Sequence, residues 1–162
     1  IVVAGDHVLP GYLDGEGDAE TKFEVDDRRW HRTGDAGWID DTGRLWLLGR
    51  CSARLIDRPG DEAVSVDAEE AASVYPFPVE CAARTQPGVR RAAFVRHRGD
   101  RVLAVERTPG ASVDPSALRA ALTSVAPQLD SVLCVDTLPV DRRHNAKIDY
   151  PALTTLLDSR RA

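Results

Sequence analysis

Two apolar segments on either side of a short turn-forming run constrain the fold of this chain more than any other feature. Trp38 and Ile39 precede the run Asp40-Asp41-Thr42-Gly43, and the segment Leu45-Trp46-Leu47-Leu48 follows it. Glycine is suited to the backbone conformation of a tight turn, and short apolar segments joined in this way are typical of two adjacent antiparallel strands. The pattern predicts a β-hairpin over residues 38–48.

Charged residues flank this hairpin, and each follows a glycine. Asp35 follows Gly34 at the end of the run Trp30-His31-Arg32-Thr33-Gly34-Asp35, and Arg50 follows Gly49. A carboxylate on a turn can accept hydrogen bonds from both hydroxyls of a ribose, and arginine offers a fork of donors. The alternative is structural, because glycine and aspartate are common turn residues. Asp35 and Arg50 are therefore candidate nucleotide-binding residues, with a turn role as the other interpretation.

A single lysine stands out near the end of the chain. Only two of the 21 lysines and arginines are lysines, Lys22 and Lys147, and Lys147 lies in the turn-rich run 138–149. A rare lysine in such a loop is a candidate point charge in a site, the alternative being a solvated surface cation. His144, in the same loop, is a candidate general base or a surface histidine.

Four ordered motifs resemble the adenylate-forming superfamily, which includes acyl-CoA synthetases, adenylation domains of nonribosomal peptide synthetases and firefly luciferase. They are the opening strand and turn from Ile1 to Leu13, the segment from Trp30 to Gly37, the pair Gly43-Arg44-Leu45 and Gly49-Arg50, and Lys147. The resemblance covers nearly the whole chain. It implies the C-terminal portion of a longer enzyme, with an α+β fold.

The resemblance also implies two domains and a set of roles. Residues 1–50 would be the β-rich end of the large domain, and residues 51–162 a small α+β C-terminal lid, with Ser52 at the hinge. The family reaction is attack of a carboxylate on the α-phosphorus of ATP, giving an acyl-adenylate and pyrophosphate. Lys147 would be the catalytic residue, Asp35 and Arg50 would hold the ribose, and Mg²⁺ would shield the phosphates, its ligands lying mostly upstream of this chain.

Within the superfamily, the closing run PVDRRHNAKIDYPAL and residues 74–80 look most like the olefin β-lactone synthetases. These enzymes use ATP to cyclise 2-alkyl-3-hydroxy fatty acids, and His144 would act on the 3-hydroxyl. An ordinary ligase that passes the acyl group to CoA or to an acyl carrier is the alternative. A stand-alone, non-catalytic lid that serves as a binding domain is a second alternative.

Charge and cysteine content narrow the class of partner. The net charge of −5 and the isoelectric point near 5.4 argue against nucleic acid. Paired arginines at Arg90-Arg91, Arg142-Arg143 and Arg160-Arg161 either steer an anionic nucleotide or lie on a solvated surface. Three widely spaced cysteines without a metal-ligand pattern favour a reducing cytoplasm, and no segment approaches the roughly twenty apolar residues of a membrane span.

The remainder of the chain predicts alternating helices and strands. We expect helices over residues 67–72 and 79–85, strands over 91–96, 101–106 and 132–135, and a helix beginning after Asp114-Pro115. Predicted core residues are Ala93, Val95, Leu103 and Val105 in the strands, and Leu118, Ala121, Leu122 and Val125 on one helix face. Trp30, Trp38 and Trp46 either pair across strands in a core or line a site.

Overall fold

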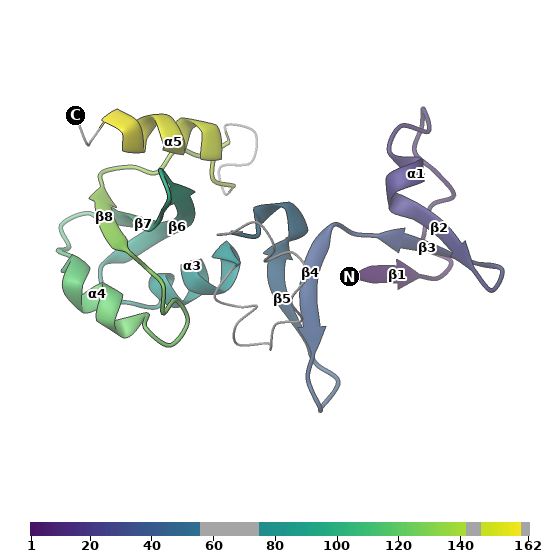
Figure 1. Cartoon of the computed structure of the whole chain (residues 1–162), viewed down its shortest axis with the longest axis horizontal. Helices are drawn as coiled ribbons and strands as arrows, with labels where there is room; N and C mark the ends of the chain where they lie inside the picture. Colours follow the sequence, from purple (N-terminus) through teal and green to yellow (C-terminus); the bar gives the residue numbers. More distant parts are fainter. Residues whose placement is uncertain (56–74, 142–146, 160–162) are drawn as a thin grey trace. The chain divides into compact units, whose positions relative to one another are not determined.

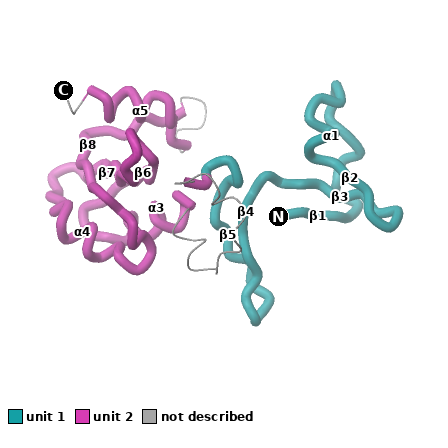
Figure 2. Tube along the Cα trace, in the orientation of Figure 1, with its two compact units in different colours: residues 1–53 teal, residues 54–162 magenta. Residues whose placement is uncertain are grey.

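The structure, a computed structural model, describes residues 1–55, 75–141 and 147–159. The chain divides into two compact units, Ile1–Ala53 and Arg54–Ala162 (Figure 1, Figure 2). Both helices and sheets are present, which confirms the predicted α+β class. No helix in the described ranges is long and apolar enough to span a lipid bilayer.

The first unit contains two small antiparallel sheets. One sheet has the order β1-β3-β2, formed by β1 (Val2–Ala4), β2 (Lys22–Val25) and β3 (Arg28–Arg32), with the short helix α1 (Asp18–Thr21) before β2. The other pairs β4 (Asp35–Ile39) with β5 (Leu45–Arg50), and the 3₁₀ turn η1 (Cys51–Ala53) follows it. The β4–β5 pair is the predicted hairpin.

The turn of this hairpin is held by Asp40. Its carboxylate accepts hydrogen bonds from the backbone N–H groups of Thr42 and Arg44, each at 3.0 Å, and from Nε1 of Trp46 at 2.8 Å. Hydrogen bonds from the side chains of Thr42 and Trp46 and from backbone Arg44 hold the pKa of the Asp40 carboxyl well below its usual range. Gly43 has φ +80°, as expected for the turn glycine.

The tryptophans of unit 1 pair across strands. Trp38 and Trp46 are register partners whose rings stack 6.0 Å apart, and they are 37% and 47% exposed. The prediction of a pair is therefore confirmed, but the prediction of a core position is wrong for these two residues in the described chain. Trp30 stacks on its cross-strand partner Phe23, with ring centroids 6.4 Å apart, and both are half-buried.

In its described residues, the second unit is a three-stranded sheet covered by three helices. Its elements are α3 (Pro76–Arg84), β6 (Val89–His97), β7 (Asp100–Arg107), α4 (Pro115–Ala121), β8 (Ser131–Val135) and α5 (Tyr150–Ser159). The sheet order is β6-β7-β8, with β6 antiparallel and β8 parallel to β7. These elements confirm the predicted strands and the helix over 79–85, whereas the helix expected over 67–72 lies outside the described residues.

Helices cover both faces of this sheet. Phe94, Leu103 and Val105 pack in one cluster with residues of α3 and α4, and Ala93 and Val102 pack in another with residues of α5. Three of the four predicted strand core residues are fully buried, and Val95 is half-buried. They belong to two clusters rather than one, because successive side chains of a strand point to opposite faces.

The helix after Asp114-Pro115 is shorter than its apolar pattern predicts. Asp114 caps it by accepting a hydrogen bond from the Ser116 N–H at 2.9 Å, but α4 ends at Ala121, which is exposed. Leu118 and Leu122 are buried as predicted, and Val125 is partly buried. Serine, threonine and β-branched residues that precede a proline disfavour a longer helix, so the chain after Ala121 forms turns.

Candidate active site

Asp35 and Arg50 lie opposite each other at the end of the hairpin away from its turn. They are register partners, and Nε of Arg50 lies 3.3 Å from Oδ1 of Asp35. Nη1 of Arg50 also donates a hydrogen bond to the carbonyl oxygen of Thr33 at 2.9 Å. The side chains are 33% and 63% exposed. The structure therefore brings the two predicted nucleotide-binding residues together as an ion pair accessible to solvent.

The turn before Asp35 explains why a glycine, Gly34, directly precedes this residue. Gly34 has φ +75°, a conformation that other residues adopt only with strain. The Asp35 N–H donates to Oγ1 of Thr33 at 3.1 Å, and the Cys51 N–H donates to the Gly34 carbonyl at 2.9 Å. These hydrogen bonds fix the backbone of Asp35 relative to the backbone of the residue after Arg50. The turn role and the binding role proposed from the sequence are thus compatible, because an ionised carboxylate has more acceptor sites than one arginine occupies.

Lys147 lies at the stem of a loop in the second unit. Val140 and Ile148 form an antiparallel bridge, the Asp141 N–H donates to the Lys147 carbonyl at 2.9 Å, and the Asp149 N–H donates to the Pro139 carbonyl at 3.0 Å. Lys147 itself is exposed. Residues 142–146 of this loop, among them the candidate base His144, lie outside the described residues.

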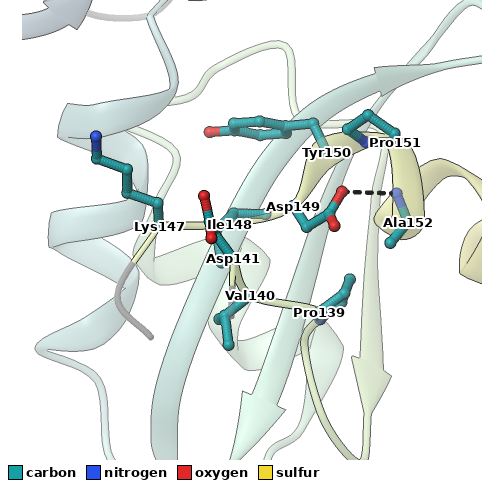
Figure 3. Close-up of a pocket in the computed structure, with 9 residues that line it drawn as sticks. All are labelled: Pro139, Val140, Asp141, Lys147, Ile148, Asp149, Tyr150, Pro151 and Ala152. Atoms are coloured by element: carbon teal, nitrogen blue, oxygen red, sulfur yellow. Dashed lines mark hydrogen bonds between the residues drawn. The ribbon is translucent and has the colours of Figure 1, made fainter. Parts of the chain in front are cut away.

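A pocket adjoins Lys147 on the second unit (Figure 3). It is lined by Pro139, Val140, Asp141, Lys147, Ile148, Asp149, Tyr150, Pro151 and Ala152. Asp149 caps α5, since its Oδ1 accepts a hydrogen bond from the Ala152 N–H at 3.0 Å, and the Tyr150 hydroxyl points toward the Lys147 side of the pocket (Figure 3). The pocket is therefore built from the loop stem and the first turn of α5.

Tyr150 and Glu80 are two ionisable groups near this pocket that sequence reasoning did not identify. Burial, and secondarily the Glu80 carboxylate, raise the pKa of Tyr150 to about 12, so its hydroxyl stays protonated at neutral pH. Burial also raises the pKa of Glu80, against the hydrogen bond that Oε1 accepts from the Phe94 N–H at 2.9 Å. Glu80 thereby satisfies a backbone donor of β6, which is an edge strand of the sheet.

Glu106 is a further residue that the sequence analysis missed. It is fully buried in β7, with Nη1 of Arg90 2.9 Å from Oε1 and Nη1 of Arg91 3.7 Å from Oε2. Arg90 and Arg91 were predicted to steer a nucleotide or to lie on a solvated surface. The structure shows that both pair with this carboxylate while the Arg90 side chain stays 53% exposed and that of Arg91 31% exposed. The signal in the sequence is a glutamate directly after the apolar run 102–105.

The candidate residues divide between the two units. Asp35, Arg50 and Ser52 belong to the first unit, with Ser52 exposed in η1, and Lys147 belongs to the second. Within the described part of the chain, no cluster of three or more histidine, cysteine, aspartate or glutamate side chains could hold a metal ion. None of the three cysteines, all of which are described, forms a disulfide.

Known proteins of similar sequence or structure indicate the family of this chain. No family model matches the chain. An olefin β-lactone synthetase of Stenotrophomonas maltophilia is 36% identical over 138 residues, which cover 80% of this chain and 23% of that protein. A 2-succinylbenzoate–CoA ligase of Bacillus licheniformis is 36% identical over 92 residues, 57% of this chain and 16% of that protein.

A solved structure extends the likeness over nearly the whole chain. The amide bond synthetase McbA from Marinactinospora thermotolerans superposes with a TM-score of 0.68 and 27% identity, covering 96% of this chain and 30% of that one. The chain thus spans less than a third of the length of each of these proteins. These similarities agree with the four ordered motifs, and the chain belongs to the adenylate-forming superfamily.

Proposed function

We propose that this chain is part of an ATP-dependent enzyme that activates a carboxylic acid as an acyl-adenylate. The observation that carries the proposal is the Asp35–Arg50 pair, fixed by strand register and open to solvent, in a chain whose relatives are ligases and synthetases. A solvent-accessible carboxylate beside a guanidinium is suited to holding a ribose by its hydroxyls. Residues 1–50 then form the end of the large domain, residues 51–162 form the lid, and Ser52 lies at the hinge.

In this proposal each residue acts on a different part of the substrate. Asp35 accepts hydrogen bonds from the ribose hydroxyls, and the contact with Arg50 keeps the Asp35 carboxylate oriented. Lys147 contacts the carboxylate and the α-phosphate, where negative charge is redistributed as the carboxylate oxygen attacks phosphorus and pyrophosphate leaves. When bound, Mg²⁺ neutralises phosphate charge. Its ligands are proposed to lie mostly upstream of this chain, as the family resemblance implies.

The finer proposal is that the acid is a 2-alkyl-3-hydroxy fatty acid and that the product is a β-lactone. In that case the 3-hydroxyl oxygen attacks the adenylate carbonyl, AMP leaves, and a base accepts the hydroxyl proton. His144 is proposed as that base. The similarity to an olefin β-lactone synthetase over 80% of this chain supports this substrate class.

A second candidate is ligation of the acyl group to CoA or to an acyl carrier. The similarity to a 2-succinylbenzoate–CoA ligase favours it, although that similarity covers a smaller share of this chain. Both candidates share the adenylation step and differ only in the nucleophile that attacks the adenylate. A cytoplasmic location, expected from the cysteine pattern, stays a prediction.

One assay separates these candidates. The full-length protein is incubated with ATP, Mg²⁺ and a long-chain 2-alkyl-3-hydroxy acid, with and without CoA, and the product mass is measured. Loss of water from the acid without CoA supports lactone formation, whereas a thioester formed only with CoA supports the ligase. If pyrophosphate is not released with any acid tested, the adenylation proposal fails and a non-catalytic binding domain is favoured.

A further inference from the structure

Glu106 is a buried charge that the proposed reaction does not use directly. Its side chain has no solvent exposure, at the end of the central strand of the three-stranded sheet. Burying an ionised carboxylate costs several kcal/mol unless it is paired and hydrogen-bonded. A residue with only a packing role at this position would be better served by an apolar side chain, like its neighbours Val105 and Ala104.

A β-bulge supplies the charges that pair with Glu106. The register of β6 against β7 shifts between Val89 and Arg91, so that Arg91 faces Glu106 and Arg90 is the extra residue. A bulge of this kind places two residues opposite one. Both guanidinium groups thus lie near the same carboxylate, Arg90 at 2.9 Å from Oε1 and Arg91 at 3.7 Å from Oε2.

The Glu106 carboxylate also contacts the chain segment that leads to Lys147. Oε2 accepts a hydrogen bond from the Leu138 N–H at 2.9 Å, and Leu138 is fully buried. Two residues farther on, Val140 pairs with Ile148, and Asp141 donates to the carbonyl of Lys147. The path from Glu106 to Lys147 therefore consists of one buried hydrogen bond, a short stretch of chain and the loop stem.

We propose that Glu106 is a positioning residue for Lys147. It ties the start of the lysine loop to the central strand, and the two arginines of β6 hold its carboxylate in the orientation that accepts the Leu138 N–H. This inference rests on the proposed function, because it requires that Lys147 acts in adenylate formation. A displacement of about 1 Å in a group at the reacting centre can reduce a rate by about a hundredfold, so a fixed anchor has a direct consequence for chemistry.

The two carboxylate oxygens have separable roles, which makes a matched pair of variants informative. The Arg90 contact to Oε1 lacks hydrogen-bond alignment and is an ion pair, whereas Oε2 accepts the backbone hydrogen bond. Glu106→Gln removes the charge and keeps an acceptor for Leu138. Glu106→Leu removes both. Val105→Ala is the control, since Val105 is the adjacent, fully buried residue on the opposite face of the sheet.

The experiment measures two reactions of the full-length protein for each variant. One is pyrophosphate release from ATP and the acid, and the other is product formation from a synthetic acyl-adenylate, a reaction that bypasses Lys147. We expect Glu106→Leu to lower kcat for pyrophosphate release about tenfold or more, with KM for ATP within about twofold and the second reaction unchanged. Glu106→Gln should lose only about threefold, because a neutral acceptor replaces a charged one.

The outcomes distinguish this inference from the proposed function. If Glu106→Leu matches Val105→Ala, or slows both reactions equally, Glu106 has only a structural role and the inference is overturned. If Glu106→Leu does not fold, Glu106→Gln decides: faster exchange of the Leu138 amide hydrogen with an unchanged rate of pyrophosphate release also overturns it. If the unmodified protein releases no pyrophosphate, the proposed function fails, and this role of Glu106 fails with it.

Discussion

The β4–β5 hairpin and the β6-β7-β8 sheet hold their candidate functional side chains by different means. In the hairpin, Arg50 contacts Thr33 and Asp35, and the contacts join neighbouring strands through a turn glycine and strand register. In the sheet, the segment that carries Lys147 is tied to Glu106 by a buried hydrogen bond between residues 32 positions apart. The first arrangement is local and exposed, and the second is long-range and buried.

This difference predicts whether a substitution in each region should change ligand binding, stability or the rate of the chemical step. Ile39 and Leu45 in the hairpin are 68% and 55% exposed, whereas Leu103 in the sheet is fully buried. Changes in the hairpin should therefore alter binding with little effect on stability, because little buried apolar surface is at stake. Changes in the sheet should alter stability, and those near Glu106 or Lys147 should alter the chemical step.

Removal of Lys147 tests the largest expected difference between the two regions. Lys147→Ala should lower pyrophosphate release about 10²–10³-fold while leaving ATP binding largely intact, because the lysine charge acts on the transition state. Steady-state kinetics and equilibrium ATP binding on the full-length protein measure both quantities. Lys22→Ala, at the other lysine of the chain, is the control. Unchanged pyrophosphate release in Lys147→Ala would remove Lys147 from the mechanism.

Truncation of one leucine in each region compares how much its side chain contributes to the free energy of unfolding. Leu103→Ala should reduce the free energy of unfolding of the sheet by about 3 kcal/mol, because it leaves a cavity between β7 and the helices α3 and α4. Leu45→Ala should cost less than about 1 kcal/mol, since that side chain is 55% exposed. Urea unfolding followed by amide hydrogen exchange assigns each loss to its region. Equal losses would contradict the contrast.

The sequence predicted local features well and long-range pairing poorly. Gly43 and the apolar segments around it identified the hairpin, and the segments 91–96 and 101–106 identified β6 and β7. The ion pair of Asp35 with Arg50 depends on a register that shifts between Ala36 and Gly37, and no pattern indicates such a shift. Glu106 was missed for the same reason, because its partners meet it through a second register shift and a hydrogen bond from Leu138.

The motifs indicate candidate site residues but not what positions them. Lys147 was singled out by its rarity and by its place in the closing motif, and these features say nothing of the loop stem that holds it. The division of the core into two clusters was also missed. The run Val102 to Val105 is apolar at every position, so its periodicity does not reveal that both faces are covered.

Substitution of the hairpin pair tests whether the exposed region acts in binding. Asp35→Asn should raise KM for ATP about tenfold with a smaller change in kcat, because a neutral amide accepts ribose hydroxyl hydrogen bonds less strongly than a carboxylate. Addition of Arg50→Gln should cost less than the sum of the single changes, since the two side chains are in contact. Asp41→Asn, in the exposed hairpin turn, is the control. A fall in kcat at constant KM would assign Asp35 to the chemical step instead.

Titration of Glu80 should give the smallest effect and test the buried region alone. Burial raises the pKa of Glu80 above 4.5 in the folded state, so folding favours its protonated form. The resulting stabilisation is fully present below pH 4.5 and is lost as the pH rises through the folded-state pKa.

In Glu80→Gln this loss is absent, because the amide does not ionise but still accepts the Phe94 hydrogen bond. Stability of the unmodified protein relative to Glu80→Gln should therefore fall as the pH rises above 4.5, as measured by urea midpoints. A pH-independent difference between the unmodified protein and Glu80→Gln would show that burial does not raise the pKa of the Glu80 carboxyl.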